Sequence, residues 1–416
     1  MAELAAAVMQ RIDELGRITD EQGRLTRTFC SPAMRRANDL VASWMRQAGM
    51  AVREDAIGNL IGHFPLQGGS RTIQNRNSKV LLLGSHLDTV RDAGRFDGAL
   101  GVLVAIACVK QLRENQTRLP FAVEVIGFAE EEGVRYRRPY LGSKFFAGTF
   151  DGRYLDCQDQ AGITMREAIR TFTGKRQPLS ARPPDPRRLL GYVEVHIEQG
   201  PVLEQRNLAL GVVSGIAGQT RAQITFTGRA GHAGTTPMSL RRDALAAAAE
   251  FVMAVEKLAK TRSGLVATVG ELQVSPGVSN VIPGTAGLSL DLRHSADAAR
   301  RAARDTLRGR MQQIAGKRKL RGDWKAISGT PATECDRQLT RLLTESVRRH
   351  QKQSIAMTSG AGHDGAVMAA MTPVTMLFVR CKHGISHHPS ESATRRDVAV
   401  AIAVMLDFIQ SLARDA

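Results

Sequence analysis

Short hydrophobic runs and a helix of small apolar residues dominate the first half of the chain. The runs at 79–83, 121–128 and 189–197 have the length and composition of strands buried on both faces of a sheet. The stretch from Leu100 to Arg113 lies between the first two runs and predicts an apolar helix. Strand, helix and strand in this order indicate a parallel βαβ unit, in which consecutive strands end at the same edge.

Amphipathic helices are predicted near both ends of the chain. Ser31 followed by Pro32 is a helix start, with a capping side chain and a proline in the first turn. Residues 52–64 favour a strand that Gly58 and Asn59 interrupt. The other predicted elements are helices at 4–18, 31–48, 339–352 and 395–413 and a strand at 375–380.

The pattern changes near residue 210. Hydrophobic and polar residues alternate over 220–228, which is typical of a strand with one exposed face. Strands at 265–274 and 287–292 and helices at 244–260 and 296–314 complete a β-α-β-β-α order, the outline of a ferredoxin-like sandwich. This part of the chain therefore predicts a self-contained, inserted unit.

We predict an α/β protein with two domains. A mostly parallel sheet forms a catalytic domain from residues 1–209 and 329–416, and a ferredoxin-like α+β domain occupies 210–328. Hinges are expected near 211–215 and 329–331, where glycine and proline gather.

Composition favours a globular, soluble protein. With 416 residues, of which 43% are hydrophobic, the chain is long enough for two cores. Residues 1–22 lack a basic segment followed by an apolar core, so neither a signal peptide nor a membrane span is predicted. The five cysteines lie far apart and never form a CxxC pair, which favours a reducing cytoplasm over a disulfide framework or a zinc knuckle.

The formal net charge of +17 raises the question of a nucleic-acid partner. The basic residues are mostly dispersed, with concentrations in the loop 175–188 and in a predicted helical stretch at 300–325. Aromatic residues make up only 5% of the chain, and no stacking platform or recognition helix is evident. We therefore expect neither a nucleic-acid nor a membrane partner, but a positive field that attracts small anionic substrates.

Residues that can bind metal ions follow three of the predicted strands. They are His86, Asp88 and Asp97, then Glu130, Glu131 and Glu132, and finally His196, Glu198 and Gln199. Histidine and carboxylate side chains at the carboxyl edge of a sheet suggest a metal site, and three adjacent carboxylates repel one another unless cations hold them. Taken alone, a helix-capping aspartate, an ordinary core histidine and a solvated acidic turn remain alternatives.

Ten short motifs are distributed, in order, through almost the whole chain. They are GSHLDTV (84–90), FDGALGV (96–102), EEGVRY (131–136), HIEQGPVLE (196–204), GQTR (218–221), GRAGHAGTTPM (228–238), SNVIPG (279–284), DLRH (291–294), SGAGHD (359–364) and GISHHPSE (384–391). Together they resemble the metal-dependent amidohydrolases of the M20 peptidase family. Within that family the chain is most similar to the branch of allantoate amidohydrolases, N-carbamoyl-L-amino-acid hydrolases and β-ureidopropionases.

The resemblance implies a site for two divalent metal ions. Asp97 would bridge the two ions, and the remaining ligands would be His86, Glu132, His196 and His387. Glu131 would be the general base, and Asp88 would orient His86. The family pattern selects His387 over its neighbour His388. Manganese or zinc is expected, with cobalt and nickel as further candidates.

The resemblance also implies a substrate-binding set. Arg293 would grip a substrate carboxylate, a task that suits its planar, two-pronged group. Gln199, Gln219, Asn280 and His363 match further polar contacts. His232 would stabilise the oxyanion, from its own chain or from a partner, with an ordinary loop histidine as the alternative. Closure of a lid formed by residues 210–328 would carry Arg293, Asn280 and His232 onto the substrate, and the same domain would form a homodimer.

The function implied is hydrolysis of a ureido C–N bond, with loss of ammonia and carbon dioxide. Allantoate is the leading substrate because the acidic Glu130 precedes the EEG motif. The alternatives are N-carbamoyl-L-amino-acid hydrolase, β-ureidopropionase, an M20 dipeptidase or N-acyl-amino-acid deacylase, and, in a different class, a basic polyanion-binding protein without catalysis. Residues 380–383 and Gly365 depart from the family pattern near the expected substrate end and leave the exact substrate open.

Overall fold

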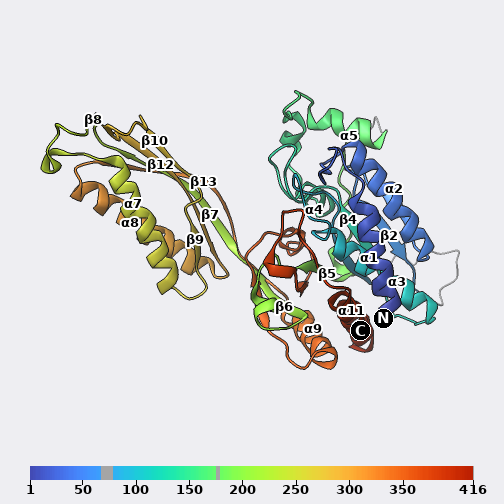
Figure 1. Ribbon diagram of the computed structural model, residues 1–416. Coiled ribbons are helices and arrows are strands. Elements are labelled where there is room, and N and C mark those ends of the chain that lie inside the picture. Colours follow the sequence, from blue (N-terminus) through green and yellow to red (C-terminus); the bar gives the residue numbers. More distant parts are fainter. Residues whose placement is uncertain (67–77, 175–178, 416) are drawn as a thin grey trace. The chain divides into compact units, whose positions relative to one another are not determined.

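The computed structural model describes residues 1–66, 78–174 and 179–415 (Figure 1). Part of the predicted basic loop, residues 175–178, lies outside the described residues. The chain divides into two compact units. Unit 1 comprises Met1–Ser214, Cys335–Met357 and His363–Ala416, and unit 2 comprises Gly215–Glu334 and Thr358–Gly362. The predicted assignment of catalytic and lid roles to such parts stays a prediction.

The sheet of unit 1 is mainly parallel at its centre, which confirms the predicted α/β class. In the order β1-β2-β4-β3-β5-β16-β6, β3 pairs in parallel with β4 and β5, and β16 pairs in parallel with β5, while the outer pairs are antiparallel. Short strands β14 (Thr333–Glu334) and β15 (Ala356–Ser359) also pair with β6. The bounds are β1 Ala51–Glu54, β2 Leu60–Phe64, β3 Val80–His86, β4 Ala122–Phe128, β5 Leu189–Ile197, β6 Leu210–Ile216 and β16 Val374–Val379.

Long helices enclose the main core of unit 1. Helix α3 (Ala99–Glu114) packs against the central strands and is apolar nearly all round, since residues from Ala99 to Val109 are buried. Helices α1 (Ala2–Gly16), α9 (Arg337–His350) and α11 (Arg395–Asp415) complete this layer. The remaining helices are α2 Pro32–Gln47, α4 Leu141–Phe146, α5 Met165–Thr173, α6 Val202–Gln205 and α10 Asp364–Met368.

Unit 2 is an antiparallel sheet with two helices on one face. Its central strands β7 (Gly218–Thr227) and β12 (Thr285–His294) alternate buried residues such as Ile224 and Leu290 with exposed or half-buried polar ones. Helices α7 (Ala244–Thr261) and α8 (Asp297–Lys317) cover the apolar face. The other strands are β8 Gly231–His232, β9 Val266–Thr268, β10 Leu272–Ser275, β11 Val281–Ile282 and β13 Arg321–Thr330.

Two local predictions are wrong. The basic stretch 300–325 is not one helix, because α8 ends at Lys317 and the chain returns as strand β13, paired with β7. The predicted strand at 265–274 is two strands, both paired with β12. The predicted hinge at 211–215 includes the point between Ser214 and Gly215 at which the chain passes from unit 1 to unit 2, within β6. Its role as a hinge stays a prediction. No helix of the described residues has the length and apolar character that a membrane crossing requires.

Candidate metal centre and active site

Parallel strands of unit 1 bring distant parts of the chain to one edge. Strand β3 ends at His86, β5 carries His196 one residue before its end, and β4 ends at Phe128, shortly before the acidic turn 130–132. Because the three strands are parallel, their carboxyl ends meet, as in open α/β proteins that bind ligands at this edge. His387 reaches the same cluster from the segment that follows β16.

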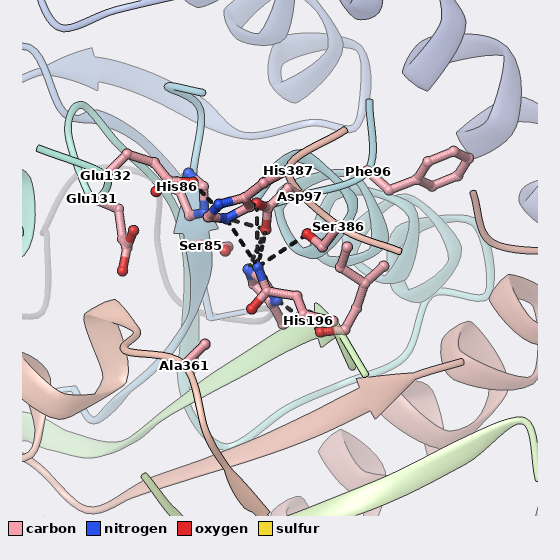
Figure 2. A network of polar contacts seen from close by, with 12 residues as sticks. Ser85, His86, Phe96, Asp97, Glu131, Glu132, His196, Ala361, Ser386 and His387 are labelled. Atoms are coloured by element: carbon pink, nitrogen blue, oxygen red, sulfur yellow. Dashed lines mark hydrogen bonds and ion pairs between the residues drawn. The ribbon is translucent and has the colours of Figure 1, made fainter. Parts of the chain in front are cut away.

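Asp97 lies at the centre of this cluster (Figure 2). Its Oδ1 atom is 3.1 Å from Nε2 of His196 and 4.0 Å from Nε2 of His86, and its Oδ2 atom is 3.1 Å from Nε2 of His387. Nε2 of His387 is also 3.4 Å from Oε1 of Glu132. A carboxylate that faces imidazoles from both of its oxygens is placed to bridge two cations.

Backbone groups orient the two buried imidazoles. Nδ1 of His86 is 3.0 Å from the carbonyl oxygen of Asp88 and 3.3 Å from its Oδ1, and Nδ1 of His196 is 2.9 Å from the carbonyl oxygen of Ile197. These contacts fix the ring orientation and direct Nε2 of each ring toward Asp97. Asp88 thus contacts the His86 ring, and its predicted role in orienting His86 stays a prediction.

Asp97 is itself held in place by a residue that sequence reasoning missed as a site residue. Glu391 is 1% exposed, and its Oε1 accepts hydrogen bonds from the backbone N–H groups of Phe96 (2.8 Å) and Asp97 (3.0 Å). Its Oε2 accepts a hydrogen bond from Ser386, next to His387 (2.9 Å). Glu391 therefore links the bridging carboxylate to the histidine segment, and its place in the motif GISHHPSE was the available signal.

Gly98 leaves room for the His86 ring. It directly follows Asp97 and has a positive φ of 65°, a conformation that favours glycine. A Cβ atom at this position would lie 2.5 Å from ring atoms of His86. The backbone conformation and the close approach both require glycine here.

The acidic turn presents two further carboxylates to the cluster. The backbone N–H groups of Glu131 and Glu132 donate to the two oxygens of Asp88, at 3.0 and 3.2 Å. Ligand atoms of His86, Glu131 and Glu132 lie within 4.8 Å of one another. Burial, reinforced by Glu132, raises the pKa of Glu131 well above its usual value, and burial together with Asp97 raises the pKa of Glu132 to about 7.

The protein without metal stabilises charges of opposite sign at Asp97 and the histidines. Although burial opposes its charge, hydrogen bonds from His196 and His387 hold the pKa of Asp97 well below its usual range. The hydrogen bond to Asp97 raises the pKa of His387 to about 9. Burial alone would lower the pKa of His86, but its contact with Asp88 raises it well above the usual value. Binding of a cation by these imidazoles would therefore be coupled to loss of their protons.

Gln199 and His363, both predicted to contact substrate, lie beside the same cluster. Nε2 of Gln199 is 3.2 Å from Oγ of Ser386 and 3.3 Å from Oδ1 of Asp97. Gln199 and His387 each have a backbone φ of 56°, which residues other than glycine seldom adopt. The ring of His363 stacks edge-on against His196, with 4.5 Å between ring centroids.

A second carboxylate that sequence reasoning missed lies behind the histidines. Glu194 is fully buried on β5, accepts a hydrogen bond from Oγ of Ser85 (2.9 Å) and accepts another from the N–H of Gly365 (3.1 Å). It therefore joins β3, β5 and the His363 segment. The signal was a charged residue two positions before His196 in an otherwise apolar strand.

The donor set fits divalent cations. Four groups of three residues each bring metal-binding atoms within 4.8 Å of one another. The groups are His86, Asp97 and His196; Glu194, His196 and His363; His86, Glu131 and Glu132; and Asp97, Glu132 and His387. Imidazole and carboxylate ligands suit zinc, manganese, cobalt and nickel, and buried carboxylates this close together need positive charge to compensate them.

The other four predicted site residues belong to unit 2 and form two separate pairs. Gln219 and Arg293 are direct partners in the β7–β12 register. His232 pairs with Val281 between β8 and β11, and the N–H of Ala233 donates to the carbonyl oxygen of Asn280 (2.9 Å), so His232 and Asn280 are neighbours.

These two pairs lie at opposite ends of the unit 2 sheet. Arg293 is eight residues from Thr285, where β12 begins, and at about 3.3 Å per residue the strand spans roughly 26 Å between them. Asn280 lies before that beginning, and Figure 1 shows β8 at the far end of unit 2 from the start of β7. Unit 2 of one chain therefore cannot bring Arg293, Asn280 and His232 onto the same small molecule. This corrects the expectation that closure of one lid would do so.

The departures at 380–383 have partners in α11, in α6 and in the turn that follows β5. Arg380 donates to both carboxylate oxygens of Asp397 in α11 (2.8 and 3.0 Å). The N–H of His383 donates to Glu204 in α6 (2.9 Å), and the thiol of Cys381 is buried against the carbonyl oxygen of Gly200. The backbone N–H of Gly365, by contrast, contacts Glu194. Gly365 thus borders the cluster, and Cys381 lies beside the turn that carries Gln199.

A mainly parallel sheet with a histidine and carboxylate cluster at its carboxyl edge is compatible with a metal-dependent hydrolase. The comparisons with known proteins identify which kind. The profile of peptidase family M20/M25/M40 matches residues 82–411, and the chain belongs to this family. This confirms the family resemblance inferred from the ten motifs.

The curated relatives of this chain include allantoate deiminases and N-carbamoyl-L-amino acid amidohydrolases. The chain is 40% identical to an allantoate deiminase of Arabidopsis thaliana, over 99% of the chain and 83% of the relative. It is 39% identical to an N-carbamoyl-L-amino acid amidohydrolase of Geobacillus stearothermophilus, over 97% of the chain and 98% of the relative. A solved amidase of the hydantoinase/carbamoylase family from Burkholderia multivorans superposes with a TM-score of 0.90, at 31% identity and 98% coverage of both chains.

Proposed function

We propose that this protein hydrolyses a ureido C–N bond and releases ammonia, with allantoate as the leading substrate. N-carbamoyl-L-amino acids and N-carbamoyl-β-alanine are the alternatives. The observation that carries the proposal is the cluster around Asp97, which unites three histidines and two glutamates in a chain whose full-length relatives bear the names of ureido-cleaving enzymes. We propose a cytoplasmic location, since all five cysteines are free.

The proposed metal ligands are His86, Asp97, Glu132, His196 and His387. Their contacts support two divalent ions that share Asp97, with manganese or zinc as the first candidates. When bound, such ions lower the pKa of water and polarise a carbonyl oxygen.

Glu131 is the proposed general base. It is 8% exposed, lies in the same group as His86 and Glu132, and is not needed as one of the five proposed ligands. Its carboxylate accepts a proton from the attacking water and then delivers that proton to the leaving nitrogen. Because Asp88 holds the backbone N–H of Glu131, the base stays in register with His86.

Substrate recognition falls to Arg293 and Gln219 at one end of unit 2, and to Gln199 and His363 beside the metal ligands. Arg293 binds the substrate carboxylate through paired N–H groups. The amide of Gln199 and the ring of His363 contact the polar atoms of the ureido group. The positive net charge attracts such anionic substrates from a distance.

His232 and Asn280 are proposed to act on the substrate of a partner subunit. Within one chain, roughly 26 Å of strand separates their end of the sheet from Arg293. A homodimer formed through unit 2 overcomes this separation, because each chain then supplies one pair to its own site and the other pair to its partner's. In that position His232 stabilises the oxyanion that forms during attack.

Ammonia release tests the proposal. Metal-stripped protein is reconstituted with manganese and assayed with allantoate, N-carbamoyl-β-alanine and N-carbamoyl-L-amino acids. Preferential turnover of allantoate is expected. Ammonia release from N-carbamoyl compounds but not from allantoate would favour an N-carbamoyl-L-amino-acid hydrolase or a β-ureidopropionase. Hydrolysis of dipeptides or N-acyl amino acids, without ammonia from any ureido compound, would overturn the proposal.

A further inference from the structure

One carboxylate in unit 2 gathers four hydrogen bonds from three side chains. Asp291 accepts from Nε2 of Gln219 at 2.7 Å and from Nε of Arg221 at 3.1 Å. It also accepts from Nε and Nη2 of Arg293, at 2.9 and 3.0 Å. Two of these three partners, Gln219 and Arg293, are the proposed substrate contacts at this end of the sheet.

The strand register places these residues on one face. Asp291 lies opposite Arg221, and Arg293 lies opposite Gln219, on adjacent strands β12 and β7. The intervening Leu292 points to the apolar face that the helices cover and is fully buried. On β12, Asp291 is thus the neighbour of Arg293 on the face that the helices leave open.

The contacts of Arg293 with the described residues use three of its five donors. A guanidinium group has five N–H donors, one on Nε and two on each terminal nitrogen. Nε and one N–H of Nη2 bind Asp291, and one N–H of Nη1 donates to the carbonyl oxygen of Gly360 (2.7 Å). One N–H on each terminal nitrogen remains. Such a pair matches the two oxygens of a carboxylate.

The charge of Asp291 also limits the positive charge at this end. Arg221 and Arg293 are both within hydrogen-bond distance of Asp291, so the three groups together carry a single net positive charge. Although partial burial opposes its charge, the hydrogen bonds from Arg293 and Arg221 hold the pKa of Asp291 below its usual value. A lone carboxylate on the substrate then neutralises the group completely.

We propose that Asp291 is a positioning residue that fixes the Arg293 guanidinium with two donors outward and so determines preference for substrates with one carboxylate. The inference rests on the proposed function, because it takes Arg293 as the carboxylate-binding group. Without Asp291, the long Arg293 side chain keeps its charge and loses the contact that fixes its direction.

The test combines Asp291→Asn with two ligands that differ in one group. N-carbamoylglycine has a carboxylate, and its carboxamide has a neutral amide at the same place. Turnover with manganese-loaded enzyme should show KM for the carboxylate raised about tenfold by Asp291→Asn, with kcat changed less than about threefold, because the lost interaction is one of binding. Constants for the carboxamide should be unchanged.

Asp323→Asn is the matched control. Asp323 is exposed on β13 of the same sheet and pairs with Arg321, two residues away, at 2.8 Å. The Asp323–Arg321 pair, like the Asp291–Arg293 pair, joins an aspartate and an arginine two residues apart on one strand, but it lies outside the proposed site. Equal effects of the two substitutions, or an equal effect of Asp291→Asn on both ligands, would show that Asp291 only supports the fold and would overturn the proposal.

Binding separates this inference from the proposed reaction. In a Glu131→Gln background, calorimetry measures the affinities of the same two ligands without turnover. A selective loss of carboxylate affinity in Asp291→Asn supports the positioning role even if the wild-type protein releases no ammonia, an outcome that would refute only the reaction. Unchanged carboxylate affinity would refute the positioning role even if ammonia release is confirmed.

Discussion

The two candidate halves of the site are built in contrasting ways. Around Asp97 in unit 1, side chains from five separate segments converge in a buried cluster whose ring orientations are set by backbone groups. In unit 2 the predicted contacts lie on or near exposed surface, in two pairs at opposite ends of one sheet. If the proposed roles are correct, the reacting centre is assembled within one unit, whereas substrate recognition is divided between two ends of unit 2 and requires a second subunit.

The largest effect is expected from the proposed base. Glu131→Gln removes proton transfer but keeps the size of the side chain and the proposed ligands. We expect kcat to fall by about 10²–10⁴-fold. Ammonia release measures the loss, and metal analysis should show an unchanged metal content. Turnover near the wild-type level would remove Glu131 from the mechanism.

A mixing experiment asks whether recognition is really shared between chains. His232→Ala and Glu131→Gln proteins, each nearly inactive, are unfolded together or exchanged as subunits. If His232 acts on the partner's site, each mixed dimer has one complete site, and about a quarter of wild-type activity should return at random exchange. No recovery, with mixed dimers demonstrated by differential tagging, would place His232 in its own chain's site.

Asp88 tests how far the unit 1 cluster depends on residues that bind no metal themselves. Asp88→Asn keeps the shape but weakens the hold on His86 and on the N–H groups of Glu131 and Glu132. Metal affinity should fall by about 10–100-fold. Competition with a chelator measures the change. Asp92→Asn changes a half-buried aspartate whose backbone N–H donates to Oγ1 of Thr26. It is the control and should leave affinity unchanged.

Metal binding should become tighter as the pH rises. In the metal-free protein the pKa of Glu132 is raised to about 7 and that of His387 to about 9, so both groups hold protons at pH 6. Ligands must lose these protons to bind metal, and apparent affinity should rise about tenfold or more from pH 6 to pH 8. Calorimetry in two buffers with different ionisation enthalpies should detect proton release. Affinity independent of pH would contradict the assignment of these ligands.

The smallest functional effect is expected at Arg380. Arg380→Met leaves Asp397, which is 1% exposed, without its cationic partner, so stability should fall by about 1–3 kcal/mol. KM should stay within about twofold of wild type, since the pair lies away from the cluster. Replacing Asp397 by leucine in the same protein should recover part of the stability. A large change in KM would instead indicate that Arg380 affects substrate binding.

Much of the framework was predictable because its signals are local. The apolar runs that became β3, β4 and β5 each end in polar residues within a few positions, and the α/β class followed from them. The family followed from the ten ordered motifs. Strand β13 was missed because Arg321, Asp323 and Lys325 mask a strand whose alternation has few apolar residues to reveal it. Local composition favoured a helix there, and pairing with β7 decided otherwise.

The supporting residues were harder to predict because their partners are distant in sequence. Glu391 binds the backbone at Asp97, almost 300 residues away, and Glu194 binds Ser85 across two strands. Asp291 is visible as a charged residue beside Arg293, but only the β7–β12 register reveals its contact with Gln219. The roles of the predicted ligands, base and substrate contacts remain predictions for the experiments above.

Gly98 has a consequence for how this protein tolerates change. A single added methyl group would fall 2.5 Å from the His86 ring, so the imidazole or the backbone before α3 must move. A chain with alanine at this position would retain every proposed ligand in its sequence and yet lose the arrangement that binds metal. Inventories of ligand residues would count such a variant as intact, because what it lacks is empty space.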